Sequence, residues 1–267
     1  MRGRSMAIIL FLIAFSASTV GSITGIGGGV VVKPLIDALG LLSVSVLSFL
    51  SACMVLAMSL ISLWRNRRAG VKIHFAQMTG LASGAAIGGI AGKQIFRWIQ
   101  ENAAQPDILG LYQNVVLLLV TILAFFYTLQ KKKIHTHRLE GEIPKMLCGL
   151  TLGTLSAFLG IGGGPINLMV LSFFFSMDSK NAAIHSLFII VVSQAVSLGV
   201  MAASGTIPIF EPVQLALMIV GGAGGAVLGS HLMKKMSFQG VDGVFLFMLA
   251  FTAVTCVISI IRFSGAM

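Results

Sequence analysis

The stretch Gly25-Ile-Gly-Gly-Gly29 returns in the second half of the chain as Gly160-Ile-Gly-Gly-Gly164. Each copy lies inside an apolar run, and a proline follows each one, Pro34 or Pro165. A glycine inside a helix costs about 1 kcal/mol relative to alanine, so three adjacent glycines should interrupt or unwind the helix. We therefore expect one broken helix in each half of the chain.

The two glycine runs belong to a longer internal repeat with an offset of about 135 residues. Ala57-Met-Ser-Leu60 corresponds to Ala195-Val-Ser-Leu198, and a glycine at every fourth position recurs at Gly84, Gly88 and Gly92 and again at Gly221, Gly225 and Gly229. The fourfold spacing puts these glycines on one helix face, which favours close helix packing. The pattern predicts a first repeat at 1–130, a basic cytoplasmic linker at 131–145 and a second repeat at 146–267.

The composition is that of an integral membrane protein. Hydrophobic residues make up 57% of the chain and charged residues 10%, whereas soluble domains carry about 25% charged residues. The apolar runs are continuous and approach the roughly 20 residues that a membrane-spanning helix needs. We expect an all-α, polytopic transmembrane bundle of two four-helix repeats, with about eight spans at 6–32, 41–64, 74–96, 108–130, 144–175, 182–203, 209–231 and 241–263.

The net charge of +10 does not indicate a nucleic-acid partner, because the basic residues crowd into short gaps between apolar runs. The two clusters are Arg65, Arg67, Arg68 and Lys72, and Lys131, Lys132, Lys133, Arg138 and Lys145. Such clusters are typical of cytoplasmic loops. With eight crossings they predict that both termini are cytoplasmic and that the two repeats are parallel, although Lys234 and Lys235 then fall on the outer face.

A broken helix exposes a new N-terminus, whose free N–H groups and positive dipole end suit an anion. Two such ends facing each other would form an anion site. Lys33 lies about one turn beyond Gly29 and could supplement the positive charge or extend to the membrane interface. The candidate substrate-binding residues are Gly27, Gly28, Gly29, Lys33, Gly162, Gly163, Gly164, Asn167, His185 and Gln194. For the neighbouring hydroxyls of Thr24, Ser48, Ser51 and Ser186, structural hydrogen bonds are the preferred interpretation.

The sequence gives little indication of an enzyme, a metal site or ion coupling. The three cysteines are widely spaced, and no HExxH, GxSxG or paired carboxylates point to an enzyme. We expect no cofactor and no metal site. All eight acidic residues, Asp37 among them, are expected at span ends or in loops, which leaves no carboxylate for ion coupling inside the membrane.

The duplicated GxGGG motif, followed by Pro34 in one half and by Pro165 in the other, resembles the TauE/SafE family, also called the TSUP permeases. The resemblance covers essentially the whole chain. It implies a multi-pass permease of a bacterial cytoplasmic membrane that moves small sulfur-containing or carboxylated anions such as sulfite or sulfonates. The halves differ from each other, because Leu168 occupies the position of Lys33 and the prolines follow their glycines at different distances.

The leading hypothesis is a secondary transporter, most simply an exporter, that works by alternating access at the two breaks. Its partners would be a small anion and the lipid bilayer, and the sequence leaves open whether the chain forms a homo-oligomer. An anion channel with a glycine-lined constriction is the alternative. An enzyme or assembly factor is disfavoured, because the motifs that such a function needs are missing from the sequence.

Overall fold

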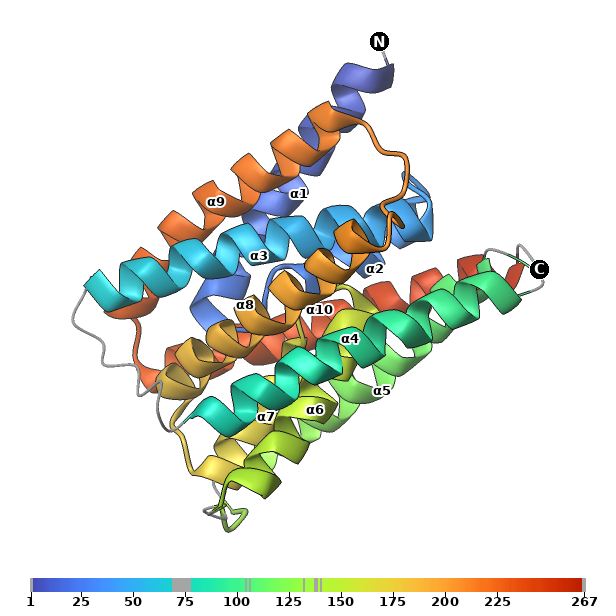
Figure 1. The fold of residues 1–267 in the computed structure, drawn as a ribbon. Coiled ribbons are helices and arrows are strands. Elements are labelled where there is room, and N and C mark those ends of the chain that lie inside the picture. Colours follow the sequence, from blue (N-terminus) through green and yellow to red (C-terminus); the bar gives the residue numbers. More distant parts are fainter. Residues whose placement is uncertain are drawn as a thin grey trace.

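The computed structural model describes residues 2–68, 78–103, 105, 107–131, 133–136, 139 and 141–265. Lys72, Lys132 and Arg138 of the two basic clusters lie outside these residues. The described chain is all-α (Figure 1), with helices α1 (Arg2–Thr24), α2 (Gly29–Leu39), α3 (Val44–Arg68), α4 (Thr79–Asn102), α5 (Asp107–Gln130), α6 (Glu142–Leu159), α7 (Gly164–Phe175), α8 (Ser179–Ala203), α9 (Pro212–Lys235) and α10 (Phe238–Gly265).

Six of the described helices, α1, α3, α5, α8, α9 and α10, are long and apolar enough to cross a membrane. The expected spans at 6–32 and 144–175 are each divided into two helices at the glycine runs, as the motif predicts. The expected span at 74–96 corresponds to α4, which does not reach the same apolar standard within the described residues. The total of eight crossings therefore stays a prediction.

The short helices α2 and α7 turn back toward the end of the bundle from which α1 and α6 come (Figure 1). Pro34 lies inside α2, whereas Pro165 occupies the first turn of α7, where a proline fits the helix without loss. In the middle of α2, the carbonyl of Pro34 accepts a hydrogen bond from Ser259 Oγ of α10 at 2.8 Å. Each glycine break is thus the tip of a hairpin of one long arm and one short arm.

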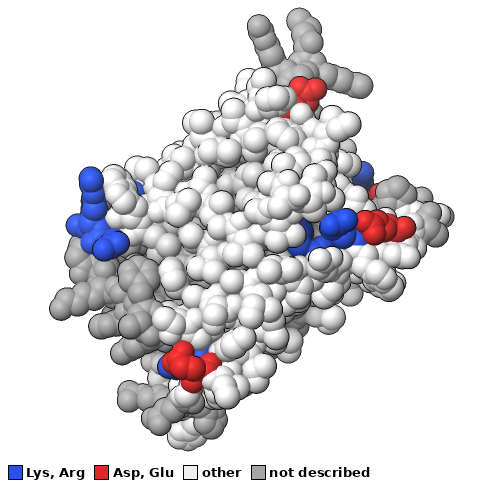
Figure 2. Space-filling model, in the orientation of Figure 1, with Lys and Arg blue, Asp and Glu red and all other residues white. Residues whose placement is uncertain are grey.

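Because α2 and α7 turn back, the helix termini gather at two ends of the bundle, and these ends differ in their charged residues. At the first, which we call the basic end, Arg65 of α3 donates to Ser230 of α9 at 2.9 Å, and Lys131, directly after α5, pairs with Asp242 of α10 at 2.5 Å. Helices α3, α5, α7 and α9 finish here, so Lys234 and Lys235 lie at the same end as Arg65. Figure 2 shows a broad band without described charged residues between charged groups at the margins of the face in view.

Both termini of the described chain lie at the opposite end, which we call the terminal end (upper right in Figure 1). Here Arg262 of α10 donates to the carbonyl of Asp37 in α2. The first half of the chain, α1–α5, therefore enters the bundle at the terminal end and leaves it at the basic end, whereas the second half, α6–α10, enters at the basic end and leaves at the terminal end. Charge alone favoured two parallel repeats. The arrangement differs because α2 turns back instead of crossing the bundle, so that α3 begins at the same end as α1.

The glycines at every fourth position pack helices closely, as the spacing predicts. A methyl group at Gly88 of α4 would lie 2.7 Å from the amide nitrogen of Thr154 in α6, and one at Gly225 of α9 would lie 2.8 Å from that of Thr19 in α1. Helices α4 and α6, and likewise α9 and α1, run parallel in these two contacts. Each glycine-rich helix therefore supports the long arm of the hairpin from the other half of the chain.

Candidate functional site

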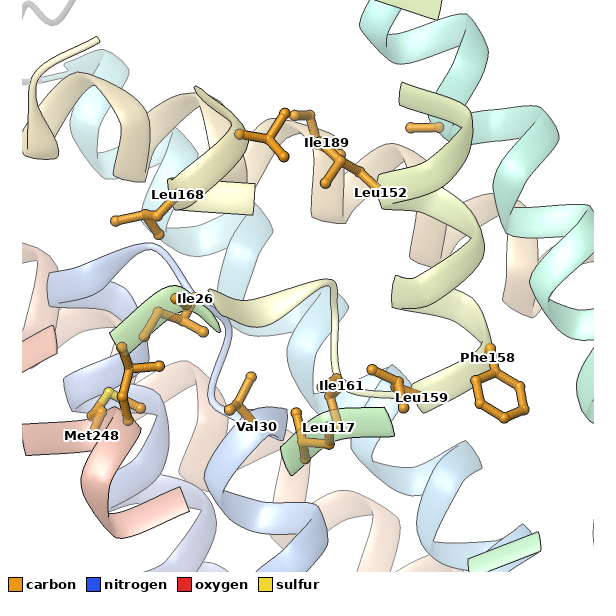
Figure 3. Close-up of a cluster of buried hydrophobic side chains, with 14 of the residues drawn as sticks. Ile26, Val30, Leu117, Leu152, Phe158, Leu159, Ile161, Leu168, Ile189 and Met248 are labelled. Atoms are coloured by element: carbon orange, nitrogen blue, oxygen red, sulfur yellow. The ribbon is translucent and has the colours of Figure 1, made fainter. Parts of the chain in front are cut away.

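The two glycine breaks meet inside the bundle. Every residue from Gly21 to Val30 is buried, and so is every residue from Ser156 to Pro165. A methyl group at Gly29 would lie 2.8 Å from Cα of Ile161, and one at Gly164 would lie 2.5 Å from a side-chain carbon of Val30. The two breaks, separated by more than 100 residues in sequence, therefore form one structural unit, whose apolar side chains are drawn in Figure 3.

Serines from the opposite half satisfy carbonyl groups that the breaks release. Ser51 Oγ of α3 donates to the carbonyl of Gly160 at 2.6 Å, and Ser186 Oγ of α8 donates to that of Gly25 at 2.7 Å. Unpaired backbone groups are costly in a buried, apolar setting. These two hydroxyls therefore have the structural role that the sequence interpretation preferred.

The short helices α2 and α7 begin beside each other at this crossing and lead away to opposite ends of the bundle (Figure 1). Each helix N-terminus carries about half a positive charge. Their convergence concentrates positive potential at the breaks without a cationic side chain. This is the arrangement of two facing helix ends that the paired motifs predict.

One buried polar side chain without a hydrogen-bond partner lies beside the middle glycine of each break. Asn167 of α7 is 0% exposed, both of its amide atoms lack a partner, and a methyl group at Gly163 would lie 2.8 Å from each of them. Ser18 of α1 is also 0% exposed, and its unpartnered Oγ lies 2.9 Å from the position of a methyl group at Gly28. Buried polar groups normally have hydrogen-bond partners, so each break has one unused polar side chain beside its middle glycine.

Apolar side chains close the rest of the crossing. Figure 3 shows Ile26 and Ile161 from the two breaks near Val30, Leu117 and Met248 of the surrounding helices. Val55 of α3 and Ile190 of α8 contact the breaks as well, since a methyl group at Gly27 would lie 3.3 Å and 3.5 Å from their side chains. The crossing is therefore tightly packed by apolar side chains.

Lys33 and Asp37 form a buried ion pair near the crossing. Lys33 Nζ lies 3.2 Å from Asp37 Oδ2, and the two side chains are 2% and 1% exposed. Asn114 of α5 donates to the same carboxylate oxygen at 3.1 Å. Because Lys33 is buried, its side chain does not extend to the membrane interface, which was one of the two expectations from the sequence. It also corrects the expectation for the acidic residues, because Asp37 lies near the end of a helix but is enclosed by protein.

The remaining two candidates lie on α8. Gln194 Nε2 donates to Ser156 Oγ at 3.0 Å, and the carbonyl of Ser156 accepts from the amide of Gly160. Gln194 therefore supports the start of the second break. His185 Nδ1 lies 2.8 Å from the carbonyl of Asn181 in its own helix, while Ser186, the next residue, reaches the first break.

Sequence reasoning did not select three buried polar residues: Ser18 beside the first break, Asp37 beside Lys33, and Lys93, which lies away from the breaks. Ser18 lies ten positions before Gly28, and only the hairpin geometry brings the two together. Lys93 is 2% exposed and lies in the second half of α4. Gly89, one turn earlier on the same helix face, was the available signal for its burial, because small residues allow close helix packing.

The comparison with protein families agrees with this architecture. A family model described as sulfite exporter TauE/SafE matches residues 10–256, which include both breaks and every candidate residue named above. No curated protein and no solved structure matches the chain. Members of the family are transporters rather than enzymes. The chain belongs to the TauE/SafE sulfite exporter family and is a multi-pass membrane transporter.

Proposed function

We propose that this transporter exports a small oxyanion of the sulfite or sulfonate class, which binds where the two glycine breaks cross. The observation that carries the proposal is the unpartnered amide of Asn167 beside the converging N-termini of α2 and α7. An amide N–H₂ and backbone N–H groups can donate to oxyanion oxygens. Because these donors are neutral, no salt bridge has to break when the anion leaves the site.

The closed crossing supports a carrier rather than an open pore. The seal of Ile26, Ile161 and Val30 must separate before an anion can enter, so binding and opening are linked. The first half of the chain starts at the terminal end and the second half starts at the basic end, which favours two inverted repeats, an architecture that secondary transporters use for alternating access. An interior negative membrane potential favours anion export by about 2.3 kcal/mol per charge per 100 mV, so no coupled ion is required.

The distribution of basic residues suggests that the basic end faces the cytoplasm, because cytoplasmic loops are enriched in lysine and arginine. Arg65, Arg67, Arg68, Lys131, Lys133, Lys145, Lys180, Lys234 and Lys235 belong to the helix termini and connections of that end. Both termini would then lie outside, the reverse of the expectation from eight crossings. The exception raised by Lys234 and Lys235 disappears in this orientation.

Labelling of single introduced cysteines tests the orientation. A membrane-impermeant maleimide should label Ile209→Cys on intact cells, because Ile209 is 99% exposed at the terminal end. Lys234→Cys, exposed at the basic end, should react only after permeabilisation. The unmodified chain, with Cys53, Cys148 and Cys256, gives the background. Labelling of Lys234→Cys alone on intact cells would reverse the proposed orientation.

The substitution Asn167→Leu tests the binding site. Leucine has a similar size and removes two unpartnered buried polar atoms, so the melting temperature should stay equal or rise. Sulfite flux into proteoliposomes should fall at least tenfold, because the amide that would contact the anion is gone. Loss of folding together with loss of flux would leave the site unsupported.

Asn66→Leu is the matched control. Asn66 is also 0% exposed, and both of its amide atoms lack a partner, but it lies near the end of α3 beside Arg65. The same substitution there should preserve sulfite flux. Equal loss of flux in both variants would show that buried amides matter for the fold in general and would contradict a specific role for Asn167.

A further inference from the structure

A polar cavity lies away from the glycine breaks, at the terminal end of the bundle. It has a volume of about 130 Å³, and its polar lining comes from Ser45 in α3, Lys93, Arg97, Gln100 and Glu101 in α4, and Thr206 after α8. A site needs about 10–15 Å³ of such space for one water molecule. The cavity therefore has room for a small oxyanion with part of its hydration shell.

Lys93 is the buried cation of this cavity. Its side chain is 2% exposed, and Nζ lies 4.4 Å from the centre of the Phe96 ring. Among the described residues, no carboxylate oxygen lies within 4.0 Å of it. The other buried lysine, Lys33, has the carboxylate of Asp37. A buried ammonium group without a counter-charge is costly, so an anion in the cavity would stabilise Lys93.

The other groups around the cavity leave its positive charge uncompensated. Glu101 is 65% exposed, and its carboxylate lies 3.5 Å from Arg97, which it neutralises at the rim. Ser45 lies in the first turn of α3, so the positive dipole end of that helix faces the same region. The hydroxyls of Ser45 and Thr206 and the amide of Gln100 can donate hydrogen bonds to oxygen atoms.

We propose that this cavity is a second binding site for a small oxyanion, on the route between the glycine breaks and the terminal end. Lys33 lies one turn beyond Gly29 in α2, the helix that leads from the breaks toward the terminal end, where the cavity lies. The inference rests on the proposed anion transport. In the proposed orientation the anion reaches this site last, before it leaves the protein.

Calorimetric titration of the purified protein with sulfite tests the second site. The wild type should bind two ions per chain, and Lys93→Met should bind one, while Lys93→Arg should retain both because the charge remains. Ser45→Ala combined with Thr206→Val, which leaves the buried charge in place, should weaken one of the two sites at least tenfold. Lys234→Met, the same substitution at an exposed lysine of the basic end, should bind two ions.

Two unchanged binding sites in Lys93→Met would overturn the proposal, and so would unchanged affinities in the Ser45→Ala/Thr206→Val variant if Lys93→Met failed to fold. The same titration separates this inference from the proposed transport site. Asn167→Leu should lose the site at the breaks and keep the site at Lys93. If Asn167→Leu keeps both sites while Lys93→Met loses one, the second site stands and the site at the breaks fails.

Discussion

Asp37→Leu is expected to destabilise the protein by about 3–5 kcal/mol, because it leaves the buried ammonium group of Lys33 without a counter-charge. Lys33→Met should have a similar effect, since the carboxylate of Asp37 would keep only the neutral donor Asn114. The double variant Lys33→Met/Asp37→Leu should be closer to the wild type than either single variant, because it removes both buried charges. Thermal unfolding in detergent measures all three variants.

Transport by the double variant decides the role of Lys33. An ammonium group that is already paired with Asp37 contributes little to an anion at the breaks, so we expect substantial sulfite flux once both charges are removed. A double variant as unstable as the worse single variant would contradict the pairing. A stable double variant without sulfite flux would instead indicate that Lys33 interacts with the transported anion.

Gly25→Ala is expected to abolish the folded transporter. Gly25 has a φ of +73°, where alanine costs about 1–2 kcal/mol. Its new methyl group would overlap the backbone of the buried Ala183 in α8, at 2.6 Å from the carbonyl carbon, and overpacking adds about 1–3 kcal/mol. Backbone of a packed helix cannot move aside as a flexible side chain can. The amount of monodisperse protein after purification measures this loss.

Gly205→Ala separates the two costs of Gly25→Ala. Gly205 has a similar φ of +63°, but a methyl group there would meet nothing within 4 Å. This variant should lose only the conformational cost and should remain folded and active. Equal loss of protein in both variants would show that backbone strain alone, rather than contact between the break and α8, limits folding.

The sequence contained enough information to place the breaks and the packing glycines, because both depend on local backbone properties. Three adjacent glycines interrupt a helix wherever they occur, and glycines spaced by four fall on one helix face. The direction of the chain after a break is different, because no residue in Gly25–Gly29 specifies whether α2 continues or turns back. That direction depends on contacts of α2 with α10, such as the bond from Ser259 to Pro34.

The candidate site was predictable only in part for a similar reason. Asn167 could be selected because an amide in an apolar span is difficult to satisfy, and the structure places it beside Gly163. Ser18 gives no such signal, since serines are common in membrane helices and usually bond to their own backbone. The partners of Lys33 and the burial of Lys93 depend on helices that meet only after folding.

The location of a bound anion tests the central proposal most directly. Selenite has the shape and charge of sulfite, and the anomalous scattering of selenium can locate it in crystals of the wild type and of Asn167→Leu. We predict a selenium peak in contact with Asn167 between Gly28 and Gly163 in the wild type, and no peak there in the variant. Selenite that inhibits sulfite transport yet occupies no position at the crossing would contradict the account.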